Sequence, residues 1–256
     1  MIGMEERAAE LYELVRNCQL CALARTRTNA VPGEGPLDAE VMCIGEAPGV
    51  NEDKQGRPFV GAAGQFLGEL LAAAGLQREE VYICNVLKCR PPGNRDPLPS
   101  EIEACSEYLD LQIDMVDPLV IVTLGRFSMS KWFPQQAISR IHGTVKEADG
   151  RFIVPMYHPA AALHQGNLRQ VLLEDFARLP AILQRARARR DTTHAAMPRT
   201  MSPQAATPAG ARDVAGPARE QAPGERSLGE APTLQSTAAQ QEPVPAAQQE
   251  QIRLFE

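Results

Sequence analysis

The chain has 256 residues, a formal net charge of -6 and six cysteines. Because the chain is acidic, it cannot attract nucleic acid through its overall field, and any DNA contact must use a local basic patch. No apolar run approaches the roughly 20 residues that a membrane span requires, and the N-terminus does not resemble a signal peptide. We therefore expect a cytoplasmic monomer, in which cysteines serve as metal ligands or core residues rather than in disulfides.

Composition divides the chain into a folded domain and a tail. Residues 1–184 alternate apolar runs with amphipathic segments, which is the pattern of a domain with a buried core. Residues 185–256 are rich in Ala, Pro, Gln and Arg and contain few aromatic or β-branched residues until their end. Because such a composition offers little to bury, we predict that the tail is disordered.

The first half of the domain begins with a predicted helix over residues 4–16, whose apolar residues recur at helical spacing. An apolar run at residues 40–44 predicts a first strand, and the stripe at residues 66–74 predicts a helix. The run at residues 81–85 predicts a second strand, which ends at a loop rich in proline.

The second half of the domain repeats this alternation. A long helix is predicted from Ser100 to Val116, and residues 119–124 form a continuous apolar run typical of a central parallel strand. Residues 152–157 predict the last strand, and residues 168–185 predict the last helix. Alternating strands and helices predict an α/β fold, a three-layer α/β/α sandwich around a central four-stranded parallel sheet.

Glycines or polar side chains follow every predicted strand. The strand ends are marked by residues 45–49 (Gly-Glu-Ala-Pro-Gly), Asn85, Gly125 with Arg126, and His158 with Pro159. Ligands of parallel sheets bind beyond the carboxyl ends of the strands. The sequence therefore predicts a functional site at this edge.

Four of the six cysteines lie outside the predicted strands and are candidate metal ligands, namely Cys18, Cys21, Cys89 and Cys105. The other two lie inside predicted strands, where a small apolar side chain fits the core. Cys105 lies on the apolar face of its helix, so it also fits a core position. Four thiolates suit structural zinc or a [4Fe-4S] cluster, and their spacing does not separate the two.

The passage from Cys84 to Arg95 combines a metal-type cysteine with amides and cations. Its three basic residues, Lys88, Arg90 and Arg95, form a candidate DNA-binding patch. Scattered, solvated surface charge is the alternative interpretation of the same residues.

Several motifs in order resemble the family 4 uracil-DNA glycosylases, the iron-sulfur branch of that superfamily. The motifs are residues 45–49, 56–61 (Gly-Arg-Pro-Phe-Val-Gly), 84–95 and 158–160 (His-Pro-Ala), and the resemblance covers residues 4 to about 180. It implies hydrolysis of the N-glycosidic bond of uracil in DNA, leaving an abasic site. It also implies a [4Fe-4S] cluster on the four candidate cysteines.

The resemblance assigns roles in a uracil pocket. Phe59 would stack on the flipped base, and Asn85 would read the edge that carries O4 and N3. His158 would donate a hydrogen bond to uracil O2, on which negative charge develops. Glu46 and Ala47 would line the same pocket.

The residue that positions the nucleophilic water differs from the best-known uracil-DNA glycosylases, which have an Asp where this chain has Ala47. By resemblance, Glu52 and Asn94 are the candidates for a catalytic role beside His158. Leu163 is the candidate wedge into the DNA helix. The segment 140–142 (Arg-Ile-His) resembles a loop that traps uracil sites covalently in a related branch, but it follows the third strand rather than the second, so we expect ordinary turnover.

The last six residues match a pattern of bacterial sliding-clamp ligands through Gln251, Leu254 and Phe255. Two other functions fit parts of the sequence: a non-catalytic iron-sulfur module that binds nucleic acid, and a zinc-knuckle interaction protein. Intact Phe59, Asn85 and His158 favour the enzyme over the first, and a brown iron-sulfur preparation would exclude the second.

Overall fold

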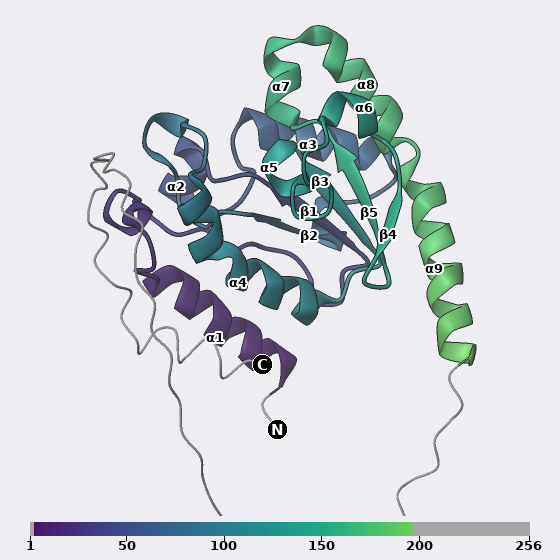
Figure 1. Ribbon diagram of the computed structural model, residues 1–256, viewed down its shortest axis with the longest axis horizontal. Coiled ribbons are helices and arrows are strands. Elements are labelled where there is room, and N and C mark those ends of the chain that lie inside the picture. Colours follow the sequence, from purple (N-terminus) through teal and green to yellow (C-terminus); the bar gives the residue numbers. More distant parts are fainter. Residues whose placement is uncertain (1–2, 197–256) are drawn as a thin grey trace, which may run out of the picture. The chain divides into compact units, whose positions relative to one another are not determined.

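A computed structural model describes residues 3–196 and contains one five-stranded sheet with the strand order β2-β1-β3-β5-β4 (Figure 1). The four predicted parallel strands are confirmed as β1 (Val41–Gly45), β2 (Val81–Asn85), β3 (Val120–Leu124) and β5 (Arg151–Met156). A fifth strand, β4 (Lys146–Ala148), pairs antiparallel with β5 at the edge of the sheet. Because β4 is short and mostly exposed, it has no apolar run that would predict it.

The helices of the described residues cover both faces of this sheet (Figure 1). The α-helices are α1 (Met4–Asn17), α2 (Val50–Gln55), α3 (Ala62–Ala73), α4 (Pro99–Val116), α5 (Arg126–Met129), α6 (Ile138–Ile141), α7 (Pro159–His164), α8 (Gly166–Phe176) and α9 (Leu179–Ala196). Three single turns of 3₁₀ helix are η1 (Ala22–Arg25), η2 (Arg78–Glu80) and η3 (Pro92–Asn94).

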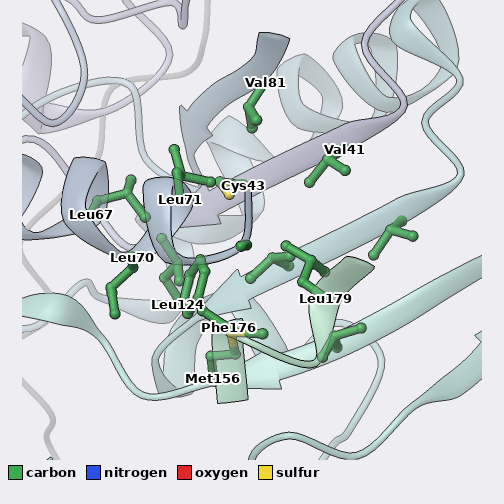
Figure 2. Close-up of a cluster of buried hydrophobic side chains, with 14 of the residues drawn as sticks. Val41, Cys43, Leu67, Leu70, Leu71, Val81, Leu124, Met156, Phe176 and Leu179 are labelled. Carbon is green, nitrogen blue, oxygen red and sulfur yellow. The ribbon is translucent and has the colours of Figure 1, made fainter. Parts of the chain in front are cut away.

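One face of the sheet packs against α3, α8 and α9 (Figure 2). Alternate strand residues such as Val41 and Cys43 point to this face, because side chains along a strand alternate between its two sides. The helices contribute Leu67, Leu70 and Phe176, all fully buried. This layer contains most of the large apolar core.

The opposite face packs against α4 and the segment after α5. Met42 and Ile44 point to it from β1, and α4 contributes Leu109 and Ile113. Beyond α4, a smaller cluster joins α1 to the cysteine-bearing segments. The predicted three-layer α/β/α sandwich is confirmed, with α1 added outside α4.

The C-terminal helices differ from the prediction. The expected helix over residues 168–185 is two helices, α8 and α9, and α9 continues to Ala196. Residues 185–196 are therefore helical, whereas the sequence predicted disorder from residue 185. Ala186 is buried and Arg187 pairs with Glu40, so this extension is held by contacts that an apolar pattern does not reveal.

The rest of the predicted tail, with its clamp-type motif, lies outside the described residues. No helix in the described range is long and apolar enough to span a membrane.

Candidate active site and metal centre

The carboxyl ends of the parallel strands converge on one pocket, as the sequence predicted. Gly45 lies opposite Asn85 in the β1-β2 register, and the Gly125 amide after β3 donates to the Met156 carbonyl of β5 at 2.9 Å. The pocket is lined by Glu46, Ala47, Pro48, Gly49, Glu52, Phe59, Ala63, Asn85, Pro91, Asn94, Arg95, His158 and Ala160. The structure therefore brings together all the residues that the sequence assigned to uracil binding and catalysis.

Asn85 offers an unused hydrogen-bonding group to this pocket. Asn85 is 2% exposed, and its side-chain oxygen Oδ1 has no hydrogen-bond partner among the described residues. A buried polar atom without a partner costs free energy, so it is retained where a ligand can satisfy it. Gly45 allows the side chains of Asn85 and Phe59 to approach the backbone of β1 closely. A Cβ at this position would lie only 2.2 Å from Asn85 Oδ1 and 2.6 Å from Phe59 Cζ.

Phe59 presents its ring to the pocket from an unusual backbone conformation. Its φ is 51°, in the left-handed region that residues other than glycine rarely adopt. The loop packs tightly on Gly64, where a Cβ would lie 1.8 Å from the Phe59 carbonyl oxygen. The Phe59 and His158 rings lie 5.7 Å apart with an interplanar angle of 25°. An aromatic face and an imidazole thus share one wall.

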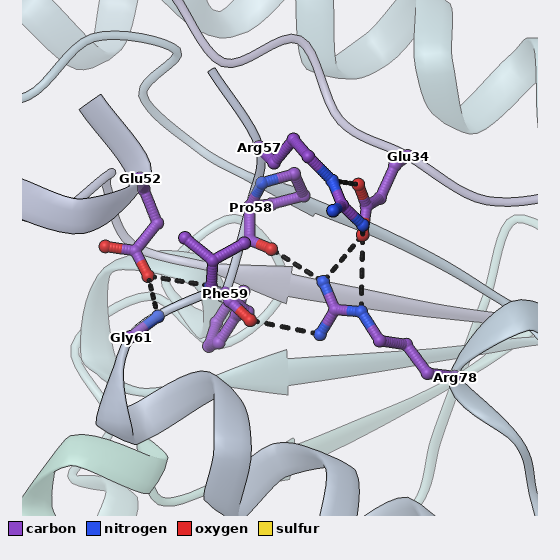
Figure 3. A network of polar contacts seen from close by, with 8 residues as sticks. Glu34, Glu52, Arg57, Pro58, Phe59, Gly61 and Arg78 are labelled. Atoms are coloured by element: carbon purple, nitrogen blue, oxygen red, sulfur yellow. Dashed lines mark hydrogen bonds and ion pairs between the residues drawn. The ribbon is translucent and has the colours of Figure 1, made fainter. Parts of the chain in front are cut away.

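Glu52 supports this loop through its carboxylate. Its Oε1 accepts hydrogen bonds from the Val60 amide at 2.9 Å and the Gly61 amide at 2.8 Å (Figure 3). The sequence assigned Glu52 to catalysis, and in the structure its carboxylate holds the backbone next to Phe59.

His158 has a defined tautomer in this structure. It is the N-cap of α7, and its Nδ1 accepts a hydrogen bond from the Ala160 amide at 3.1 Å. An acceptor Nδ1 leaves the proton of a neutral imidazole on Nε2. Burial lowers the pKa of His158 to about 4, while Glu52 opposes this shift weakly. The ring is therefore a neutral hydrogen-bond donor through Nε2.

The loop after β2 supplies the polar rim of the pocket. Asn94 has a φ of 54°, and its Oδ1 accepts from Arg90 Nε at 2.7 Å. Arg95 forms a two-pronged ion pair with the buried carboxylate of Glu101, at 2.6 and 2.9 Å. Arg90 and Arg95 are thus anchored near the rim by partners within the protein.

Leu163, the predicted wedge, is 46% exposed on α7, although an apolar side chain of that size is usually buried. Its side chain is thus available to a partner.

Glu46 is an acidic group of the pocket wall. Burial raises the pKa of its carboxyl, the nearby Asp96 raises it further, and Arg126 opposes both effects.

The burial of Lys88 contradicts its predicted place in an exposed basic patch. The residue is 1% exposed, and its Nζ donates to the Asn85 carbonyl at 2.7 Å and to Gln112 Oε1 at 2.5 Å. The ammonium therefore stabilises the backbone of Asn85 from inside the protein.

The four candidate metal ligands surround one cavity next to α4. It is lined by Cys18, Leu20, Cys21, Leu23, Leu87, Lys88, Cys89, Ala104, Cys105 and Tyr108. Cys18 ends α1 and Cys21 precedes η1, while the other two come from the loop after β2 and from α4. The remaining cysteines, Cys43 and Cys84, are fully buried in β1 and β2, as predicted.

The surroundings of these cysteines fit an iron-sulfur cluster. Cys89 Sγ accepts from Arg27 Nη1 at 3.1 Å, and Cys105 Sγ accepts from the Lys88 amide at 3.3 Å. Such bonds stabilise cluster thiolates, and the buried Tyr108 hydroxyl, which lies next to Cys18, can add another.

Two further properties concern how these cysteines would bind a metal. Burial raises the pKa of Cys89 to about 11 and that of Cys105 to about 12, so metal binding must displace their protons. Among the described residues, no three metal-binding side chains converge closely enough to hold a single ion.

No role was assigned from the sequence to two small residues that line the pocket, Ala63 and Ala160. Ala160 belongs to the motif 158–160, and Ala63 lies two residues after the motif 56–61, so their position next to these motifs was the available signal. His142, of the segment resembling a covalent-trapping loop, pairs with Asp175 at 2.7 Å and does not line this pocket.

Comparison with known proteins gives consistent matches. A family model described as Uracil DNA glycosylase superfamily matches residues 32–178. A type-4 uracil-DNA glycosylase from Sulfurisphaera tokodaii is 51% identical over 180 residues, which cover 66% of this chain and 82% of that protein. Another from Archaeoglobus fulgidus is 46% identical, covering 68% and 92% of the two chains. A third from Thermotoga maritima is 42% identical, covering 72% and 99%.

The low pKa of His158 predicts how the protein responds to acid. Between the ordinary pKa of 6.5 and a native value of about 4, the unfolded chain binds a proton that the native chain does not. Stability should therefore decrease as pH falls through this window, and His158→Gln should remove that component. Nitrogen NMR of the ring should find the neutral Nε2–H form at pH 6. A protonated ring at that pH would contradict the assignment.

Proposed function

The chain belongs to the type-4 uracil-DNA glycosylases, and we propose that its strand-end pocket carries out their reaction through Asn85, Phe59 and His158. It is a DNA repair enzyme that hydrolyses the N-glycosidic bond of uracil and leaves an abasic site. The observation that supports this use of the pocket is the unpartnered, buried Asn85 Oδ1 beside an aromatic ring and a neutral histidine. A non-catalytic binding module would not need this combination.

Recognition begins with extrusion of the nucleotide, which costs a few kcal/mol. Phe59 stacks on the base, and the Asn85 side chain accepts from N3–H and donates to O4. Cytosine presents the opposite donor and acceptor at this edge, so the same amide disfavours it.

In the chemical step, the bond between N1 of uracil and C1′ of the sugar breaks, and its electron pair goes to the base. Negative charge develops on O2, where His158 Nε2–H donates a hydrogen bond. Water adds to C1′ and loses a proton, and the departing uracil gains one. A neutral histidine suits this role because it stabilises the anion without depending on the ambient pH.

Asn94 lines the pocket and positions water or substrate at the sugar. Its backbone conformation and its bond to Arg90 fix the direction of its side chain. Glu52 contributes by holding the backbone after Phe59, with one oxygen bound to two amides. We assign it a positioning role in the reaction.

DNA contact uses the rim of the pocket. Arg90 and Arg95 can reach phosphates while their present partners hold them near the opening. Leu163 enters the space left by the flipped nucleotide, because an exposed apolar side chain gains from stacking against bases.

The cluster proposal assigns the [4Fe-4S] group to Cys18, Cys21, Cys89 and Cys105. Bound there, the group would cross-link α1, the loop after β2 and α4. The four residues would hold that loop, and with it the rim residues, in place. This use of free thiols fits a reducing, cytoplasmic compartment.

Replacing the base-reading amide tests the pocket. Asn85→Ala should reduce kcat/KM on uracil-containing oligonucleotides by about tenfold to a hundredfold, the loss expected for one or two hydrogen bonds. Binding to abasic-site DNA should be unchanged, because that product lacks the base that Asn85 contacts. Equal excision by the variant and the natural protein, measured under single-turnover conditions, would disprove the assignment.

Removal of one ligand tests the cluster. Cys89→Ala should lose iron and sulfide and impair both folding and DNA binding, because the loop after β2 loses its cross-link. Cys43→Ala is the matched control, since this buried cysteine lies in β1 and should retain the full metal content. Chemical iron and sulfide analysis of the purified proteins decides the question. A protein that holds zinc and no sulfide would refute the proposal.

The C-terminal peptide is proposed to bind the bacterial sliding clamp through Gln251, Leu254 and Phe255. Because the peptide is covalently joined to the enzyme, binding would raise the local concentration of the enzyme near clamp-bound DNA. Deleting residues 251–256 should abolish binding to the clamp of the same organism, measured by surface plasmon resonance. Cleavage of short oligonucleotides should continue unchanged. Equal clamp affinity with and without these residues would remove the proposal.

A further inference from the structure

The loop that carries Phe59 is held on both sides by charged side chains (Figure 3). On one side, the Glu52 carboxylate accepts from two backbone amides. On the other side, Arg78 donates to the carbonyl oxygens of Pro58 and Phe59, at 2.6 and 3.1 Å. The donors and acceptors around the left-handed Phe59 backbone are thus engaged by two different side chains. This arrangement offsets the cost of a conformation that the residue alone would not adopt.

Arg78 is well suited to this position. Its guanidinium is a planar fork whose donors can reach several oxygens at once. While Nη1 and Nη2 bind the loop, Nε and Nη2 also donate to Glu34 Oε1 at 3.2 and 2.7 Å. Only 23% of the Arg78 side chain is exposed, so water competes weakly for these bonds.

Glu34 connects this arginine to the strand that reads the base. The Glu34 amide donates to the Ile83 carbonyl at 2.9 Å, and the Ile83 amide donates back at 2.7 Å. Ile83 lies in β2, which ends at Asn85, and Arg78 lies directly before the same strand. Burial alone would raise the pKa of Glu34, but hydrogen bonds from Arg57 and Arg78 outweigh it and lower the pKa. Glu34 is therefore an anion that holds Arg78 in place.

We propose that Arg78 is a positioning residue for uracil recognition, and that with Glu34 it sets the location of the Phe59 ring relative to Asn85. We name this pair the Arg78–Glu34 brace. The brace does not line the pocket, and it acts through the backbone of the loop. It connects the loop of the stacking ring to the strand that ends at Asn85, so the two walls of the pocket keep a fixed position relative to each other. The proposal rests on the assigned roles of Phe59 and Asn85.

The chain provides a matched control in Arg57. This arginine also pairs with Glu34, at 2.8 Å, but 61% of its side chain is exposed. Its side chain donates to the Glu34 carboxylate, whereas the Pro58 and Phe59 carbonyls accept from Arg78. Arg57→Ala therefore removes a neighbouring positive charge and an exposed ion pair, but it leaves the hydrogen bonds to these two carbonyls in place.

The test measures inhibition by free uracil together with kcat and KM on a uracil-containing oligonucleotide. In Arg78→Ala, both KM and the inhibition constant for uracil should rise by about tenfold, as expected when a stacking contact is weakened, and kcat should change less. Arg78→Lys should show a smaller rise, because one ammonium cannot replace the fork. Arg57→Ala should stay within about twofold of the natural protein, as an exposed ion pair contributes little.

A double-mutant cycle separates positioning from general destabilisation. If Arg78 acts through the ring, Arg78→Ala should add little to the loss already caused by Phe59→Leu. Additive losses, or equal effects of Arg57→Ala and Arg78→Ala, would overturn the proposal. If Arg78→Ala does not fold, Arg78→Lys decides the same comparison. A natural protein that releases no uracil would refute the proposed function, whereas an active natural protein with an unaffected Arg78 variant would refute the brace alone.

Discussion

The parallel pairing of β1 with β2 is the constraint on which the site depends, because it sets Gly45 opposite Asn85. Gly45 leaves room for the Asn85 amide and the Phe59 ring to approach its backbone from different segments. A slip of one residue would turn the Asn85 side chain to the other face of the sheet. The fully buried residues of both strands prevent such a slip, so the large apolar core determines the geometry of a small polar pocket.

The parts of this structure that follow from local pattern could be predicted from the sequence. The central strands are apolar runs, and parallel strands put their carboxyl ends at one edge, so the pocket residues were expected to meet. The edge strand β4 and the extension of α9 have no such pattern. β4 is held by pairing with β5, and the extension is held partly by the pairing of Arg187 with Glu40. Both depend on partners that are distant in the sequence.

Long charged side chains were the least predictable, because their partners decide their roles. Lys88 and Arg90 lie two positions apart in one basic stretch, yet the first is buried and the second donates to Asn94 on the pocket rim. Lys88 is buried because Gln112, on α4, supplies an acceptor for it. The charge pattern of the sequence placed both residues in one basic patch and did not distinguish the buried cation that supports the backbone from its less buried neighbour.

Lys88 connects the pocket to the cavity lined by the cysteines, so a change at one site affects the other. Its ammonium binds the Asn85 carbonyl, and its amide donates to Cys105 Sγ, so one residue contacts both sites. Both acceptors of the ammonium are neutral oxygens, although burying an isolated charge costs roughly several kcal/mol. Negative thiolates in the adjacent cavity would offset that cost. Loss of the thiolate charge would then weaken the support beneath Asn85, even if every residue of the pocket remained in place.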